Sequence, residues 1–289
     1  MDYFEPKTVS EALSLLAKYG DHAKVIAGGT DVMVDMKYKE EPGCLVNIKR
    51  IPGLDYIQEN GGSLRVGALA TIRDVETSSL VRERLPALWE SCHQFASLQI
   101  RHTATIGGNV CRASPSGETL SPLLVLEAKA KLAFPEGEKS EPFSSLFQGP
   151  GKTRLGSKGL LTEIEVPYTA EGARSVYLKH AVRGAMDIAM VGVAVLITPD
   201  ATNSKLDDIR IGLGAVAPTP IRAQKAEALL RGKPLSAALV KEAAATAASE
   251  SSPISDQRSS GEYRRWIVEA LTRQGLEQIW KAATGKEVA

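Results

Sequence analysis

The chain has 289 residues, with 35 lysines and arginines against 34 aspartates and glutamates, so its formal net charge is only +1. This length accommodates about two domains of ordinary size. Because no basic cluster is interleaved with aromatic residues, and no apolar run approaches the roughly 20 residues of a membrane span, nucleic acid and membranes are poor partners. The first residues lack the basic and apolar parts of a signal peptide, which predicts a cytoplasmic protein. Cys44, Cys92 and Cys111 are odd in number and widely spaced, which argues against a disulfide framework and against a zinc or iron–sulfur site in this chain.

Residues 1–53 show the pattern of a small α/β unit. Thr8 and Glu11 form a capping box, and apolar residues at helical spacing follow it as far as Gly20, which predicts a helix. Strands are predicted at residues 25–27 and 44–48, with a short helix at 32–37 between them.

Residues 54–172 and 173–289 differ in the order of their predicted strands and helices. In the first of these segments, strands are predicted at residues 63–69, 129–134 and 160–166, and helices at 71–80, 86–95 and 122–126. In the second, strands at 175–182, 188–198 and 209–217 predict an antiparallel sheet, followed by helices at 224–231, 236–250 and 259–283. The last helix carries a predicted core stripe of Tyr263, Ile267, Leu271 and Trp280. We interpret residues 1–53 and 54–172 as two parts of one nucleotide-binding domain.

Two glycine pairs are the most specialised features of the chain. Gly28 and Gly29 follow an apolar run, and Gly107 and Gly108 lie in a stretch of small residues and hydroxyls. Glycine reaches positive φ angles and lets main-chain amides approach a bulky anion, and a helix starting after the first pair would add its N-terminal amides. A single glycine pair is more often a tight structural turn. Two pairs, each followed by Thr or Asn and neither carrying a lysine, favour the diphosphate of a dinucleotide held from both sides.

Other motifs carry less weight. Residues 212–217 match the G-x-G-x-x-A dinucleotide fingerprint, but Pro218 and Pro220 prevent the helix that must follow it. Residues 151–153 resemble the end of a nucleotide-triphosphate loop but lack its first glycine, which indicates a turn. The four histidines have no paired metal spacing, and no Gly-x-Ser-x-Gly elbow accompanies them, so a hydrolytic triad has little support.

The order and spacing of several motifs give a more specific indication. They include Ala27-Gly28-Gly29-Thr30-Asp31 (the first glycine motif), Thr105-Ile106-Gly107-Gly108-Asn109 (the second glycine motif), Ala113-Ser114-Pro115 and Ala185-Met186-Asp187-Ile188-Ala189. With these motifs the chain resembles, over its full length, the FAD-binding medium subunits of the molybdenum hydroxylases, a family that includes carbon monoxide dehydrogenases and bacterial xanthine dehydrogenases. The resemblance implies an α+β fold. It would consist of a vanillyl-alcohol-oxidase-type FAD-binding domain with two α/β subdomains, residues 1–53 and 54–172, and a C-terminal antiparallel sheet with helices over residues 173–289.

The resemblance also implies which residues bind FAD. The first glycine motif and its flanks contribute Ile26, Ala27, Gly28, Gly29, Thr30, Asp31, Val32 and Met33, and the second contributes Thr105, Ile106, Gly107, Gly108 and Asn109. Glu118 stands where the family usually has an aspartate that contacts the cofactor, Leu161 where an aliphatic side chain lies against the isoalloxazine, and Lys179 where xanthine dehydrogenases place a lysine near the flavin. No cysteine-bearing insertion for an additional iron–sulfur cluster is present, and no residue is assigned a catalytic or metal-binding role.

The function implied is that of an electron-transfer subunit. A large partner subunit would hold the molybdenum cofactor, a small one would hold 2Fe-2S clusters, and FAD in this chain would deliver electrons to an external acceptor such as NAD or a quinone. Two alternatives remain: a free-standing FAD-dependent oxidase or reductase with its own substrate, and a non-catalytic scaffold subunit that has lost FAD. Lys179 is the one candidate acid or base for the first alternative, and the intact glycines of both motifs argue against the second.

Overall fold

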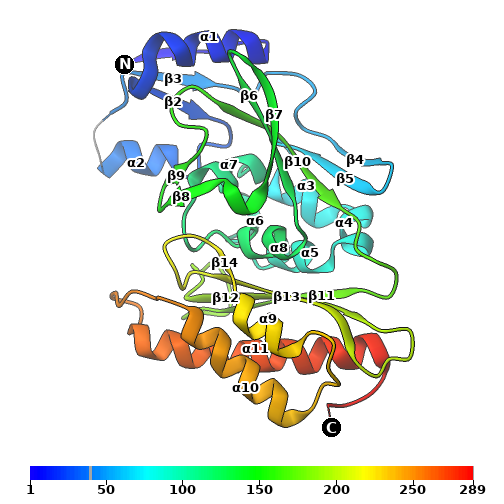
Figure 1. Ribbon diagram of the computed structural model, residues 1–289. Helices are drawn as coiled ribbons and strands as arrows, with labels where there is room; N and C mark the ends of the chain where they lie inside the picture. The colour runs from blue at the N-terminus through cyan, green and yellow to red at the C-terminus, as the bar shows by residue number, and fades with distance from the viewer. Residues whose placement is uncertain (39–40, 289) are drawn as a thin grey trace. The chain divides into compact units, whose positions relative to one another are not determined.

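The computed structural model describes residues 1–38 and 41–288 (Figure 1). Residues 39, 40 and 289, which belong to the predicted segments 1–53 and 173–289, lie outside the described residues. The chain forms two compact units, each assembled from three stretches of sequence. Unit 1 consists of Met1–Ser78, Ser97–Ser114 and Ala128–Pro167, and unit 2 of Ser79–Ala96, Pro115–Glu127 and Tyr168–Ala289. Among the described residues, no helix combines the length and the apolar character that crossing a membrane requires.

Unit 1 begins with a three-stranded parallel sheet and helix α1. The strands are β1 (Asp2–Phe4), β3 (Cys44–Asn47) and β2 (Ala23–Ile26), in that spatial order. Helix α1 (Val9–Tyr19) starts at the predicted capping box, where Thr8 Oγ1 accepts a hydrogen bond from Glu11 N at 3.1 Å. Leu13 and Leu16 of α1 share one buried core with strand β3. Helix α2 (Val32–Tyr38) follows the first glycine motif, and none of its seven residues is buried.

The second sheet of unit 1 has five antiparallel strands in the order β4-β5-β10-β6-β7. The strands are β4 (Ile57–Asn60), β5 (Ser63–Gly67), β6 (Lys129–Phe134), β7 (Gly137–Pro142) and β10 (Leu160–Pro167). The unit also contains the short helices α3 (Ile72–Thr77), α6 (Leu98–Arg101) and α7 (Ile106–Arg112), and a hairpin of β8 (Phe147–Gly149) and β9 (Lys152–Thr153). On the sheet, Glu163 accepts hydrogen bonds from Arg65 Nε at 2.7 Å and from the Tyr56 hydroxyl. Burial alone would raise the pKa of Glu163, but these two donors lower it below its ordinary value.

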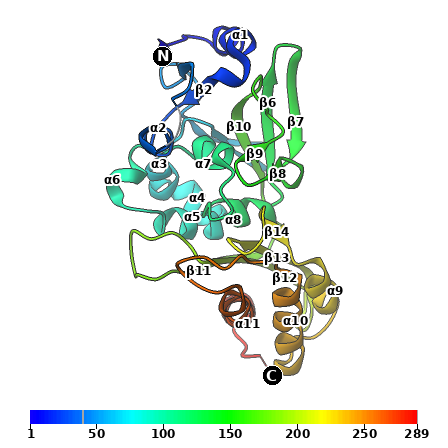
Figure 2. The same cartoon turned by 90° about the vertical axis from the view of Figure 1, so that its left-hand side faces the viewer.

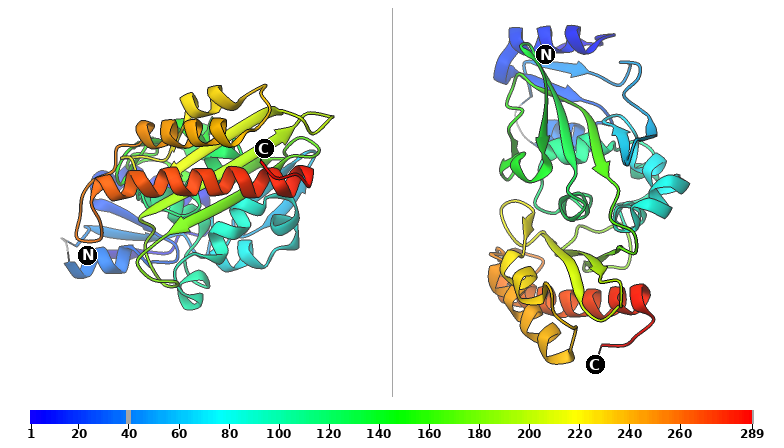
Figure 3. Two further views of the ribbon diagram at one scale, coloured as in Figure 1. Left: turned by 90° about the horizontal axis from the view of Figure 1, so that it is seen from below. Right: turned by 45° about the vertical axis from the view of Figure 1, so that its right-hand side comes forward.

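Unit 2 is built on a four-stranded antiparallel sheet in the order β11-β12-β13-β14. The strands are β11 (Arg174–His180), β12 (Val191–Pro199), β13 (Leu206–Gly214) and β14 (Ile221–Arg222). Helices α9 (Gln224–Leu230), α10 (Ala237–Glu250) and α11 (Gly261–Thr284) lie on one face of this sheet, as Figures 2 and 3 show. Helix α8 (Leu120–Val125) packs against β12 and β13 from the other face, and α4 (Ser79–Arg84) and α5 (Pro86–His93) complete the unit.

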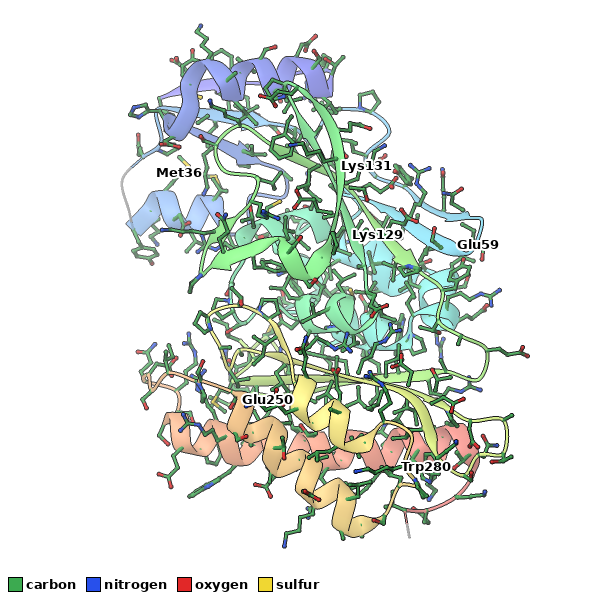
Figure 4. The ribbon with its side chains drawn as sticks, in the orientation of Figure 1. Met36, Glu59, Lys129, Lys131, Glu250 and Trp280 are labelled. Atoms are coloured by element: carbon green, nitrogen blue, oxygen red, sulfur yellow. The ribbon has the colours of Figure 1, made fainter. Side chains whose placement is uncertain are left out.

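Successive side chains of β13 point to opposite faces of the sheet, so this strand packs against helices on both faces. Ile209 and Ile211 join the buried core beneath α9 to α11, whereas a Cβ on Gly212 would lie 2.7 Å from Ser121 O of α8. Trp280 of α11, labelled in Figure 4, is 4% exposed within the same core. Packing on both faces therefore holds the sheet between helices, as expected for a buried antiparallel sheet.

Most elements predicted by clear periodicity are confirmed to within a few residues. The helix predicted at residues 71–80 is wrong in one respect: α3 ends at Thr77, and α4 starts separately because Ser78 is extended, with φ −69° and ψ 120°. The strand predicted from residue 188 begins only at Val191. Tyr263 is 38% exposed and so lies outside the predicted core stripe of α11. Strands β4 and β7 were not predicted, because their mostly exposed side chains leave no apolar alternation to detect.

Candidate functional site

The first glycine motif forms a tight connection between β2 and α2. Strand β2 ends at Ile26, whose carbonyl accepts from Ile48 N at 3.0 Å, and the helix is started by the bond from Met33 N to Gly29 O at 2.9 Å. Gly29 has φ +74°, in the left-handed region where a side chain causes strain. Within the described part of the chain, the amides of residues 28–31 donate no hydrogen bond. These four main-chain donors therefore have no acceptor among the described residues, and their contact with FAD stays a prediction.

The first glycine motif touches the residues just before the second at Gly28. A Cβ there would lie 2.0 Å from Thr103 O and 3.1 Å from Ala104 Cα, so only glycine allows this approach of the two main chains. Thr103 and Ala104 lead directly into the second glycine motif. The structure thus brings the first motif close to the start of the second in unit 1, although the first ends 74 positions before the second begins.

The second glycine motif lies at the start of helix α7, which the sequence patterns did not predict. Thr105 is the N-cap of α7, and its side chain accepts from Gly108 N at 3.0 Å. The amides of Ile106, Gly107 and Asn109 are also used, because they donate to Ala70 O, Ala68 O and Thr105 O at 2.9, 3.0 and 3.0 Å. Four of the five main-chain amides of this motif are therefore engaged within the protein, and the contact of the motif with FAD stays a prediction.

The two glycines of α7 have different structural roles. Gly107 is buried against the chain that follows β5: a Cβ there would lie 2.6 Å from Ala68 O and 2.7 Å from Ala68 Cβ. Gly108 is exposed, and among the described residues, apart from the backbone of α7 itself, a Cβ there would meet only Thr105 Oγ1 within 4 Å, at 2.9 Å. Gly107 therefore allows α7 to pack closely, whereas Gly108 leaves an exposed surface without a side chain.

Arg112, at the end of α7, is a functional candidate that the sequence patterns did not reveal. Its Nε lies 3.1 Å from Asp31 Oδ1, its Nη1 2.6 Å from Asp35 Oδ2, and its Nη2 3.3 Å from Asp35 Oδ1. This guanidinium joins α7 to both the first glycine motif and α2. Ion pairing between segments so distant in sequence leaves no local signal, apart from the position of Arg112 within the stretch that contains the second motif.

Leu161, in contrast, is largely enclosed by protein. It lies in β10 opposite Leu132 of β6, next to an irregularity in the strand register between Leu161 and Glu163. Its side chain belongs to unit 1, as the glycine motifs do, but the residue is only 2% exposed. Its predicted contact with the isoalloxazine stays a prediction.

Glu118 and Lys179 lie together in unit 2 as a buried ion pair. Lys179 Nζ is 2.8 Å from Glu118 Oε1, and it also donates to Gln94 O at 3.0 Å and to Asp187 O at 2.7 Å. The side chains of Lys179 and Glu118 are 7% and 10% exposed. Burial raises the pKa of Glu118, while the charge and the hydrogen bond of Lys179 oppose that shift. The ammonium thus links three segments of unit 2, and all three of its donor positions are used.

The rejected dinucleotide fingerprint at residues 212–217 is part of this unit as well. Its first two glycines belong to strand β13, and Ala215 follows with φ +64°. The next helix, α9, begins only at Gln224. The segment therefore lacks the strand-to-helix turn that a Rossmann phosphate site requires, which confirms its rejection.

Comparison with known proteins agrees with this architecture. Residues 1–169 match the family described as the FAD binding domain in molybdopterin dehydrogenase, and residues 176–279 match the CO dehydrogenase flavoprotein C-terminal domain. The chain is 31% identical to the xanthine dehydrogenase FAD-binding subunit of Escherichia coli O157:H7, over 98% of this chain and 97% of that protein. It is 32% identical to the carbon monoxide dehydrogenase medium chain of Hydrogenophaga pseudoflava, over 96% of each.

Solved structures give the same result. A chain of the carbon monoxide dehydrogenase from Hydrogenophaga pseudoflava that lacks the Mo-pyranopterin moiety of its cofactor matches with a TM-score of 0.94 and 33% identity, over 98% of each chain. A chain of quinoline 2-oxidoreductase from Pseudomonas putida 86 matches with a TM-score of 0.91 and 26% identity, again over 98% of each. The predicted fold class, FAD as the cofactor and the assignment to the oxidoreductases are confirmed. The chain therefore belongs to the family of FAD-binding medium subunits of the molybdenum hydroxylases, whose members include carbon monoxide and xanthine dehydrogenase subunits.

Proposed function

We propose that this chain is the electron-transfer subunit of a heteromeric molybdenum hydroxylase, passing electrons from iron–sulfur clusters of a partner subunit through FAD to an external acceptor such as NAD or a quinone. The observation that carries the proposal is the row of four amides at residues 28–31 that donate no hydrogen bond among the described residues, in the same unit as the exposed Gly108. When bound, FAD supplies the redox chemistry, because a flavin accepts electrons singly and releases them in pairs.

The residues present fit the diphosphate of FAD. Four consecutive amides at the start of α2 form a donor group of the kind that binds phosphate oxygens, and Gly29 holds them in a turn that other residues adopt with strain. Gly108 lets a bulky group pass close to α7. We propose that Asn109 contributes through its side chain, since its main-chain amide already donates to Thr105 O, and that Thr105, whose side chain caps α7, contributes as well.

For the other predicted ligands the proposal rests on the family resemblance. Ile26, Val32 and Met33 flank the four amides, and Ile26 and Val32 are half-buried while Met33 is 56% exposed, so Met33 offers apolar surface. Glu118, Leu161 and Lys179 are retained as proposed cofactor-binding residues. We also propose residues 1–53 and 54–172 as the two FAD-binding subdomains and residues 173–289 as the C-terminal domain.

The proposed partners are a large subunit with the molybdenum cofactor and a small subunit with 2Fe-2S clusters. The names of the relatives support this, since two of them are called medium chains of carbon monoxide and glyceraldehyde dehydrogenases. The composition supports it too, because this chain has three cysteines in all, two of them buried and none bonded to another, and iron–sulfur clusters need several thiolates.

The test is reconstitution. The purified chain should show a flavin absorption spectrum and should oxidise none of the substrates that its native complex oxidises. Substrate oxidation should return only when both partner subunits are added back. Turnover of such a substrate by the chain alone, in a sample free of molybdenum, would favour a free-standing oxidase. Absence of flavin from both the chain and its complex would favour a scaffold subunit.

A further inference from the structure

Helix α2 is held in an unusual way for an element that starts at a ligand site. None of its residues is buried, and Met33, Val34 and Tyr38 are 56%, 54% and 74% exposed. The apolar core of unit 1 therefore does little to fix the helix. The polar attachment is stronger, because the Arg112 guanidinium binds Asp35 through two nitrogens and Asp31 through the third.

The same contacts reduce the negative charge next to the first glycine motif, because Arg112 pairs with two carboxylates there. Asp31 is the last residue of the first glycine motif, and Asp35 lies one helical turn further, with Asp35 N donating to Asp31 O at 2.8 Å. Two carboxylates beside an anion-binding group would repel a diphosphate. The side chain of Arg112 is only 33% exposed and that of Asp35 only 20%, so solvent screens this part of the cluster incompletely.

We propose that Arg112 is a positioning residue for FAD: by pairing with Asp31 and Asp35 it offsets part of their repulsion of the diphosphate and fixes the start of α2, so that the amides of residues 28–31 face the cofactor. This inference rests on the proposed function, because it assumes that those amides bind FAD. It assigns Arg112 no contact with the cofactor.

The geometry makes the role specific to arginine. A planar guanidinium can bind one carboxylate with two nitrogens and a second carboxylate with a third, whereas a lysine ammonium acts as a single point charge. Arg112→Lys should therefore preserve the charge but loosen the attachment of α2. Arg112→Ala should remove both the positive charge and the attachment of α2.

The experiment measures FAD affinity by flavin fluorescence titration of the full chain after its flavin has been removed. Arg112→Ala should weaken FAD binding by about 10- to 100-fold, the range expected when hydrogen bonds between charged groups are lost. Arg112→Lys should be intermediate, and adding Asp35→Asn to Arg112→Ala should recover part of the affinity. Arg154→Ala is the matched control, because Arg154 pairs with Glu141 elsewhere in unit 1, and it should leave FAD affinity within about twofold of wild type.

Salt dependence separates the electrostatic role from a merely structural one. Between about 0.01 M and about 1 M salt the screening length falls roughly tenfold, so the ratio of Arg112→Ala to wild-type dissociation constants should shrink at high salt. FAD affinity of Arg112→Ala within about twofold of wild type would overturn the inference. So would a loss that neither salt nor Asp35→Asn reduces. If Arg112→Ala does not fold, Arg112→Lys and Asp35→Asn are compared with wild type in the same way. Failure of the wild-type chain to bind FAD would instead refute the proposed function.

Discussion

The two adjacent glycines of α7 should respond in opposite ways to the same substitution. Gly107 faces the protein, where a Cβ would meet Ala68 O at 2.6 Å and Ala68 Cβ at 2.7 Å. Gly108 faces outward, where in the described part of the chain, apart from the backbone of α7 itself, a Cβ would meet only Thr105 Oγ1 within 4 Å. We therefore expect Gly107→Ala to affect folding stability and Gly108→Ala to affect FAD binding.

The magnitudes follow from these contacts. Contacts below 3 Å with main chain cannot relax by a side-chain rotation, so Gly107→Ala should cost about 1–3 kcal/mol, as other overpacked sites do. For a protein of this size that corresponds to a fall in Tm of roughly 2–12 °C. Gly108→Ala gains up to about 1 kcal/mol in helix propensity, and disturbing the Thr105 cap costs up to about the same amount. Its Tm should therefore stay within about 2 °C of wild type.

The assay combines thermal unfolding of the flavin-free chain with FAD titration. Gly108→Ala should weaken FAD binding without loss of Tm, and Gly108→Val, with a larger branched side chain, should abolish FAD retention in a chain that still folds. Gly107→Ala should show the lowered Tm even without FAD. Equal Tm changes for Gly107→Ala and Gly108→Ala would refute this division of roles. Normal flavin occupancy in Gly108→Val would remove α7 from the cofactor site.

Four further outcomes are expected. Gly28→Ala should lower both stability and FAD retention, because its Cβ would lie 2.0 Å from Thr103 O; unchanged retention would show that the two motifs need not touch. FAD should be bound non-covalently, since the first glycine motif contains no His or Cys, so acid precipitation should leave the flavin in the supernatant and not in the pellet. Lys179→Met should lower the free energy of unfolding by about 3–5 kcal/mol in denaturant titration, because Glu118 is left buried without its partner, and a change below about 1 kcal/mol would contradict this. The lowered pKa of Glu163 contributes stability above pH 4.5 that is lost as the pH falls through its folded-state value; Glu163→Gln should therefore show a flatter decline of Tm below pH 4.5, and an unchanged acid limb would argue against it.

Local signals in the sequence predicted much of the fold. Thr8 with Glu11 marked the start of α1, and the alternation of β10 and the long apolar strands of unit 2 placed two sheets correctly. Helix α7 was not predicted, because two adjacent glycines are poor helix formers. Hydrogen bonds from Ile106 N to Ala70 O and from Gly107 N to Ala68 O attach its first turn, and such tertiary contacts override propensity.

The sequence predicted the individual motifs of the candidate site but not the long-range contacts that join them. The sequence identified both glycine motifs, yet the approach of Gly28 to Thr103 and the pairing of Arg112 with Asp35 join residues 75 or more positions apart. Neither contact leaves a periodic pattern. The ion pair of Glu118 with Lys179 is of the same kind, since 61 positions separate its members. Long-range pairs of this sort depend on the assembled fold, and composition alone does not specify them.

The structure also changes how the two glycine pairs are to be understood. They were expected to act alike, each offering amides to a diphosphate. Among the described residues, the amides of residues 28–31 donate no hydrogen bond, whereas in the second motif this holds only for the amide of Thr105. In the second, four of the five amides are engaged at the start of α7, and Gly108 adds an exposed surface without a side chain. We therefore expect the first motif to contribute mainly hydrogen-bond donors to FAD and the second to contribute mainly room. A substitution in the first motif should alter FAD affinity through main-chain geometry at Gly29, whereas one in the second should act through the volume of the side chain that it adds.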